Sequence, residues 1–216
     1  MKEPRTLRNE ARAEAYDYFD KNIRPLPKDN NGKIDPSQGG FYDNDVDAFR
    51  HAYVSGVFAQ EYGEKAADLF GRMNEFFNPK NIHSNSTHPE SQNMDLWNNA
   101  VGRKYGLKSK DRQSLAKALQ QALKSGEMIT DRKDKRRYEG ATHDPVNQNK
   151  PVIVLQEAEK GRNELFFDTE KKQILTAGEF IILIESGQYP GYAVRTVHGV
   201  PTPVSNPDSR GTNNLG

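Results

Sequence analysis

The residues best suited to chemistry lie in one stretch, Asp47-Ala-Phe-Arg-His-Ala-Tyr-Val-Ser55. In a helix, Asp47 and His51 stand four residues apart on one face, and Arg50 lies beside them. A histidine supplies a base near neutral pH, a carboxylate can orient it, and a guanidinium can stabilise developing negative charge. We therefore expect His51 to act as general base or ligand, with Asp47 and Arg50 as catalytic partners.

A second stretch, residues 93–105, has the pattern to supply further groups. Its apolar residues recur at helical spacing and seat the helix: Met94, Trp97, Val101 and Tyr105. Its polar residues lie on a different arc and need partners: Asp95, Asn98, Asn99 and Arg103. If the two helices face each other, Asp95 is a second carboxylate for His51. The other three are then predicted to bind an anionic or carbonyl-bearing substrate.

Further ligands are harder to assign. Glu75 lies near the end of a predicted helix over residues 64–77 and is a candidate acid, metal ligand or substrate contact. The helix dipole disfavours a carboxylate at this end of a helix, which favours a surface position for Glu75. His83 and His88 lack the tight spacing of known metal motifs, so metal and cofactor stay undetermined. Residues 27–35 imitate a calcium loop without its first Asp and last Glu, which favours a turn.

Composition narrows the function classes. The chain of 216 residues has a formal net charge of +1, so we expect no general attraction to nucleic acid. It has no cysteine, which excludes thiolate metal sites and a cysteine nucleophile. No apolar run is long enough to span a membrane, and the first residues lack a conventional signal peptide. We expect synthesis in the cytoplasm, with export requiring a specialised secretion system.

The apolar pattern predicts a mainly α protein: a helical N-terminal domain with a small α+β C-terminal module. Helices are expected over 4–23, between a cap at Asp43 or Asn44 and Gly63, and over 64–77, 93–105 and 110–124. These helices form a domain over 1–125, and a polar connector follows over 126–150. The module covers 151–205, with strands near 152–155 and 165–167, a short helix over 177–186 and a hairpin over 192–204; residues 206–216 are predicted to be a flexible tail.

The two motifs together resemble an uncharacterised bacterial domain family associated with secreted polymorphic toxins and effectors. The resemblance rests on Phe49-Arg-His-Ala52 and Met94-Asp-Leu-Trp-Asn-Asn-Ala-Val-Gly-Arg103, within residues 43–106. In that family the third helix ends with an Ala-His-Glu element, whereas this chain has Met73-Asn-Glu75 and lacks the histidine. The resemblance implies an effector-like role, with a cognate immunity or carrier protein as candidate partner, and names no reaction.

Two functions fit these observations. The first is a hydrolase that uses the residues of the two facing helices, and the second is a noncatalytic interaction module in which the same residues lock the helices together. A solvent-reachable cleft favours the hydrolase, whereas burial with every group hydrogen-bonded favours the lock. Lipid, peptidoglycan, nucleotide and protein all remain open as substrates, and the oligomeric state is undetermined.

Overall fold

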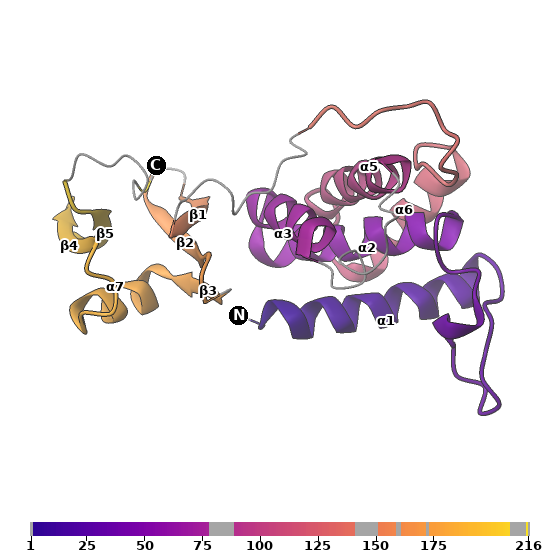
Figure 1. The fold of residues 1–216 in the computed structure, drawn as a ribbon, viewed down its shortest axis with the longest axis horizontal. Coiled ribbons are helices and arrows are strands. Elements are labelled where there is room, and N and C mark those ends of the chain that lie inside the picture. The colour runs from indigo at the N-terminus through magenta and orange to yellow at the C-terminus, as the bar shows by residue number, and fades with distance from the viewer. Residues whose placement is uncertain are drawn as a thin grey trace. The chain divides into compact units, whose positions relative to one another are not determined.

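The computed structural model describes residues 2–77, 89–140, 151–158, 161–171, 173–207 and 215, with backbone only for residues 73–77. The chain divides into two compact units, Met1–His143 and Asp144–Gly216. The first is helical, and the second combines antiparallel strands with one helix (Figure 1). The predicted mainly α fold with a small α+β C-terminal module is confirmed.

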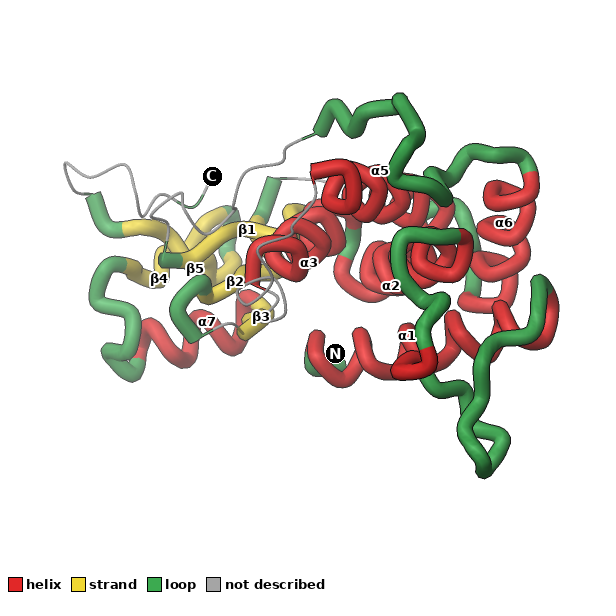
Figure 2. The backbone as a smooth tube through the Cα atoms, turned by 45° about the vertical axis from the view of Figure 1, so that its right-hand side comes forward, coloured by secondary structure: helices red, strands yellow, loops and turns green. Residues whose placement is uncertain are grey.

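The central helix of the first unit is α2 (Asp45–Tyr62). Asn44 begins it, since its side chain accepts a hydrogen bond from the backbone N–H of Asp47, and Gly63 ends it with a φ of 85°. Four helices pack around α2 (Figure 2): α1 (Pro4–Asn22), α3 (Glu64–Phe77), α5 (Pro89–Gly106) and α6 (Arg112–Lys124). A helix enclosed in this way must provide partners for its ionisable side chains inside the protein.

Helices α2 and α5 meet backbone to backbone at two glycines of α5. A Cβ on Gly102 would lie 2.0 Å from the carbonyl oxygen of Ala52, and one on Gly106 would lie 2.3 Å from that of Gly56. Only glycine permits this approach, because any side chain would overlap the facing helix. The contact brings the polar arcs of the two helices together.

The segment after α6 runs back along α5 instead of leaving the domain (Figure 1). Met128 and Ile129 are buried, and the Asn98 amide bonds both backbone groups of Ile129, at 2.8 and 3.0 Å. The Arg136 guanidinium lies over the ring of Trp97 and donates to the Met128 carbonyl. The first unit therefore extends beyond the predicted boundary at 125, because polar side chains here satisfy backbone groups; residues 141–150 lie outside the described residues.

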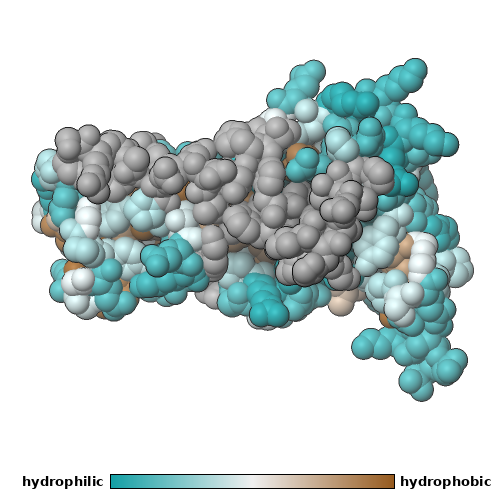
Figure 3. All heavy atoms as spheres, in the orientation of Figure 1, coloured by the Kyte–Doolittle hydropathy of each residue, from teal (hydrophilic) through white to brown (hydrophobic). Residues whose placement is uncertain are grey.

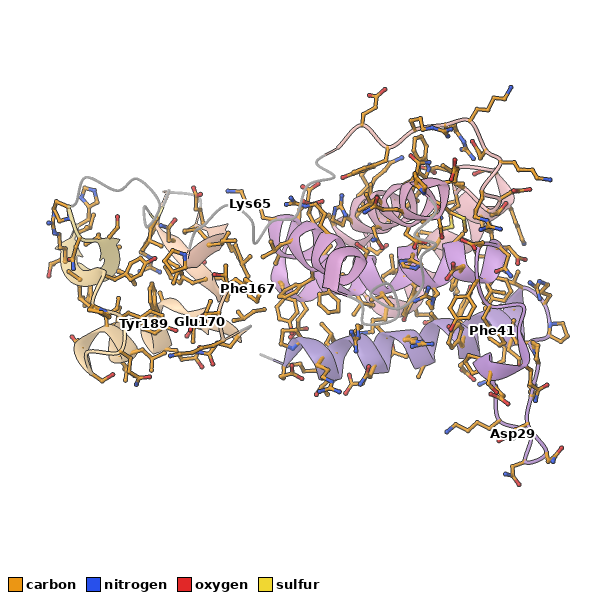
Figure 4. The ribbon with its side chains drawn as sticks, in the orientation of Figure 1. Asp29, Phe41, Lys65, Phe167, Glu170 and Tyr189 are labelled. Carbon is orange, nitrogen blue, oxygen red and sulfur yellow. The ribbon has the colours of Figure 1, made fainter. Side chains whose placement is uncertain are left out.

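The loop between α1 and α2 contains a short 3-10 helix, η1 (Pro36–Gln38), and the stretch that imitates a calcium loop. Asp29, labelled in Figure 4, accepts hydrogen bonds from the backbone N–H groups of Asn31 and Lys33, both at 2.9 Å. A bridge between Lys28 and Ile34 closes the stretch. The Asp29 carboxylate thus stabilises a turn, as predicted.

The second unit contains a three-stranded antiparallel sheet, a helix and a hairpin. Its elements are β1 (Val152–Glu157), β2 (Asn163–Asp168), β3 (Gln173–Thr176), α7 (Ala177–Glu185), β4 (Tyr192–Val197) and β5 (Val200–Ser205). Strands β1, β2 and β3 pair in that order, so that Val152 faces Asp168 and Phe167 faces Ile174. The hairpin β4–β5 turns at His198 and Gly199, which both have positive φ, as in a type I′ turn.

A small core holds the second unit together. Phe166 of β2 packs on Phe180 of α7, whose ring also contacts Tyr192 and Tyr189, the last of which is labelled in Figure 4. Thr176 caps α7 through a reciprocal pair of hydrogen bonds with Glu179, which explains why residues 177–185 form a helix instead of a strand. Strand β3 was not predicted, because only Ile174 and Leu175 of its four residues are apolar.

The visible surface gives no sign of a large apolar patch. In Figure 3 the atoms of the described residues on this face are mostly hydrophilic, with small hydrophobic areas between them. Within the part of the chain that the structure describes, no helix combines the length and apolar character needed to cross a membrane.

Candidate functional site

Five side chains from two helices meet in what we call the α2–α5 polar cluster: Asp47, Arg50 and His51 of α2, with Asp95 and Asn99 of α5. His51 Nε2 lies 3.2 Å from Asp95 Oδ1 and 3.7 Å from Asp47 Oδ1. Arg50 Nη2 lies 2.6 Å from His51 Nε2 and also bonds Asp47 Oδ1. The predicted contact between the polar arcs of the two helices is made by Asp95 and Asn99.

Asp47 is oriented by the residues that precede α2. Its Oδ2 accepts a hydrogen bond from the backbone N–H of Asp43 at 2.8 Å, which leaves Oδ1 for Arg50. Asp43 has a left-handed φ of 55°, and its carboxylate is held by the Ser91 hydroxyl and by Arg132 Nε at 3.5 Å. The start of α2, the start of α5 and the segment after α6 are therefore tied together beside the cluster.

Asn99 positions the imidazole from the other helix. Its side chain is hydrogen-bonded to His51 and is almost fully buried. Gly71 of α3 also lies against this amide, since an added Cβ would be only 3.2 Å from Asn99 Nδ2. The absence of a side chain at Gly71 therefore leaves room for Asn99.

The contacts determine the protonation states. Arg50 can only donate, so His51 Nε2 must accept, and the neutral ring carries its proton on Nδ1. Burial, followed by the nearby Arg50 cation, lowers the pKa of His51 to about 3, although Asp47 and Asn99 oppose this shift. For Asp47, burial is the largest effect and disfavours ionisation, but the charge of Arg50 together with the hydrogen bonds from Arg50 and the Asp43 backbone lowers the pKa of this carboxyl group. Near pH 7 the cluster thus contains a neutral imidazole, an ionised Asp47 and a cationic Arg50.

Three of these residues have the geometry of metal ligands. Asp47, His51 and Asp95 each offer one ligand atom, and all three atoms lie within 4.8 Å of one another. The sequence could not show this group as a spacing motif, because one of its members comes from a separate helix.

The other predicted residues lie elsewhere or outside the described side chains. Asn98 points to Ile129, and Arg103 bonds Asp68 at 3.0 Å and the Tyr138 hydroxyl at 3.3 Å. The structure therefore does not bring Asn98 and Arg103 to the cluster, although both lie on the same helix as Asp95. The side chain of Glu75, together with His83 and His88, lies outside the described residues.

Tyr16 of α1 lies beside the cluster, although it was not among the predicted site residues. This residue is buried, and its hydroxyl is close enough to Arg50 to act on the charge of the guanidinium. Tyr18, two residues further along α1, is only half-buried and bonds Gln120. At about 100° per residue, the buried stripe of Leu7, Ala11, Ala15 and Phe19 includes Tyr18 and ends before Tyr16, so helical spacing alone does not identify Tyr16.

The cluster is buried. The exposed fraction is 3% for Asp47, 7% for His51 and 4% for Asn99. A surface hollow of about 470 Å³ lies at the other end of α2 and α5, lined by Ala59, Gln60, Gly106, Leu107, Ser109, Lys110, Asp111 and Arg112. The side chain nearest to solvent in the α2 part of the cluster is Arg50, at 17%.

Comparisons with known proteins point to the same region. Residues 31–127 match a family described as Domain of unknown function (DUF6973). The match includes α2, α3, α5, α6 and every member of the cluster. Searches among curated proteins and solved structures gave no match. The resemblance to an uncharacterised domain is thus supported, and the bacterial origin and toxin association remain predictions.

Proposed function

We propose that the helical unit is an effector-type hydrolase domain whose active site is the α2–α5 polar cluster. The observation that carries this proposal is the convergence of a neutral imidazole, two carboxylates and a guanidinium at one buried point. Each group has a role in hydrolysis: the imidazole accepts a proton from water, a carboxylate stabilises the imidazolium, and the guanidinium binds negative charge. A cognate immunity protein is the expected partner.

Arg50 is the group that must move. While it donates to Nε2, the lone pair of His51 is occupied and the imidazole is a weak base. An anionic or carbonyl-bearing substrate attracts the guanidinium away, which frees Nε2 and removes one of the two main causes of the low pKa of His51. Asp95, at 3.2 Å, is then the carboxylate closest to the protonated ring. Substrate binding and activation of the base are thereby coupled.

The rival is a noncatalytic interaction module in which the cluster only locks the helices together. Its burial favours this reading. A structural lock should also satisfy its polar atoms. However, Arg50 Nε and Tyr16 Oη are buried without a hydrogen-bond partner among the described residues. These two atoms favour a site that accepts a ligand.

Expression in bacterial cells tests the proposal. The chain should be toxic in either the cytoplasm or the periplasm, and His51→Ala should abolish that toxicity. His198→Ala is the matched control, because His198 is exposed in the β4–β5 turn and should leave toxicity unchanged. The proposal is contradicted if a folded His51→Ala variant is as toxic as the wild type. It is also contradicted if the wild type is harmless in both compartments.

Two neighbouring amides separate catalysis from structure. Asn98→Ala leaves two buried backbone groups of Ile129 unpaired and should cost about 2 to 4 kcal/mol of stability. On the hydrolase reading, Asn99→Ala abolishes toxicity with little change in melting temperature. On the lock reading, Asn99→Ala costs about 1 to 3 kcal/mol. Thermal melts of both variants, beside the toxicity assay, decide between the readings.

A further inference from the structure

A positive charge already lies where Asp47, His51 and Asp95 converge. Two carboxylates and an imidazole lone pair within 4.8 Å of one another repel unless a cation stands among them. Arg50 supplies this cation, because its Nη2 bonds both His51 Nε2 and Asp47 Oδ1. The three residues therefore form a cation site in which an internal cation is bound.

The spacing of the donor atoms also suits a metal ion. His51 Nε2 is 3.2 Å from Asp95 Oδ1 and 3.7 Å from Asp47 Oδ1. Ligands bound at about 2.0 to 2.2 Å with tetrahedral angles are separated by about 3.3 to 3.6 Å. One imidazole nitrogen with two carboxylates is a donor set for Zn²⁺ or Mn²⁺, whereas Ca²⁺ and Mg²⁺ prefer oxygen alone. Three protein ligands leave a position for water, as in catalytic zinc sites.

The donors are also held from behind. Asp47 Oδ2 accepts from the Asp43 backbone at 2.8 Å, and the Asn99 side chain bonds His51. Metal-ligating carboxylates and histidines commonly have such outer contacts, which fix the direction of the ligand atom. The ligand atoms are thus preorganised without a metal.

An independent observation indicates a missing ligand. The Tyr16 hydroxyl, on a residue that is 6% exposed, and Arg50 Nε lack a hydrogen-bond partner among the described residues. Buried polar atoms in native proteins are rarely unpaired. Water on a metal ion would donate a hydrogen bond to the Tyr16 hydroxyl oxygen, and an anionic substrate group would accept one from Arg50 Nε.

We infer that Asp47, His51 and Asp95 bind a divalent transition-metal cation of the Zn²⁺ or Mn²⁺ type, in competition with the side chain of Arg50. Catalytic use of the cation rests on the proposed function and deepens it. A bound cation lowers the pKa of its water and so provides a nucleophile near neutral pH. The displaced Arg50 is then available for a negatively charged substrate group.

Calorimetric titration of the metal-free full chain with ZnCl₂, and separately with MnCl₂, tests the inference. One ion should bind per chain. Arg50→Ala should bind it at least about tenfold more tightly, because the internal competitor no longer occupies the site. His51→Gln and Asp95→Asn should each weaken binding at least about tenfold. Asp45→Asn is the matched control, since Asp45 is on the same helix but pairs with Arg24.

The outcomes are separable. If neither the wild type nor Arg50→Ala binds either ion, or if His51→Gln and Asp95→Asn bind as tightly as the wild type, the inference is overturned. Arg50→Met, which keeps the volume of the side chain, replaces Arg50→Ala if the latter unfolds. Toxicity that needs His51 in a chain that binds no cation preserves the proposed function and removes this inference. If the chain is harmless but binds a cation with the expected variant pattern, cation binding is kept and the proposed function is removed.

Discussion

His51 should make the helical unit sensitive to mild acid. Burial and the Arg50 cation lower its pKa from 6.5 to about 3 in the folded state. Between these values the unfolded chain binds a proton that the folded chain excludes, so folding becomes less favourable as the pH falls. The stability due to this effect is fully present above pH 6.5 and is lost progressively toward pH 3.

The size of the effect follows from the two pKa values. Between pH 7 and pH 5, His51 should account for a loss of about 2 kcal/mol in the free energy of unfolding. Any folded pKa below about 4 gives nearly the same result, because His51 then stays neutral at pH 5. The low pKa of Asp47 acts in the same direction, but mainly at lower pH.

Urea unfolding at both pH values, with a chelator present, measures this contribution. Trp97 is the only tryptophan of the chain and lies in α5, so its fluorescence reports on the helical unit. Wild type should lose about 2 kcal/mol more than His51→Gln between pH 7 and pH 5. His198→Gln replaces an exposed histidine and should show the same loss of stability between pH 7 and pH 5 as the wild type. Equal losses in wild type and His51→Gln would refute the argument that His51 is held neutral.

Two further predictions concern the scaffold. Gly102→Ala places a Cβ against the Ala52 carbonyl and should destabilise the helical unit by about 3 kcal/mol or more. Gly178→Ala in α7 is the control, because its Cβ meets no neighbouring atom and should leave stability nearly unchanged. Thermal melts test both variants. A fragment ending at residue 143 should unfold cooperatively in a thermal melt followed by circular dichroism. A fragment ending at residue 125 should be markedly less stable, because it lacks the buried Met128 and Ile129. Equal stability of the two fragments would show that residues 126–143 contribute nothing.

Much of the architecture is encoded locally. Apolar spacing, the Asn44 cap and Gly63 identify α2 and its limits, since these signals act within a few residues. The same spacing identifies a buried helix with an acid, an arginine and a histidine on it, and it predicts that a polar arc on residues 93–105 supplies their partners. The pairing of His51 with Asp95 was predictable to that extent.

Only the tertiary structure decides which polar residues of α5 enter the cluster. Asn98 and Asn99 are adjacent, yet the first bonds Ile129 and the second bonds His51. Successive side chains differ by about 100° around a helix, so the rotation of α5 about its axis decides which of the two amides faces α2. That rotation is set by backbone contact at Gly102 and by the segment after α6, which the sequence alone presented as a connector. Local periodicity therefore determines which helices carry the cluster, whereas long-range packing decides which side chains enter it.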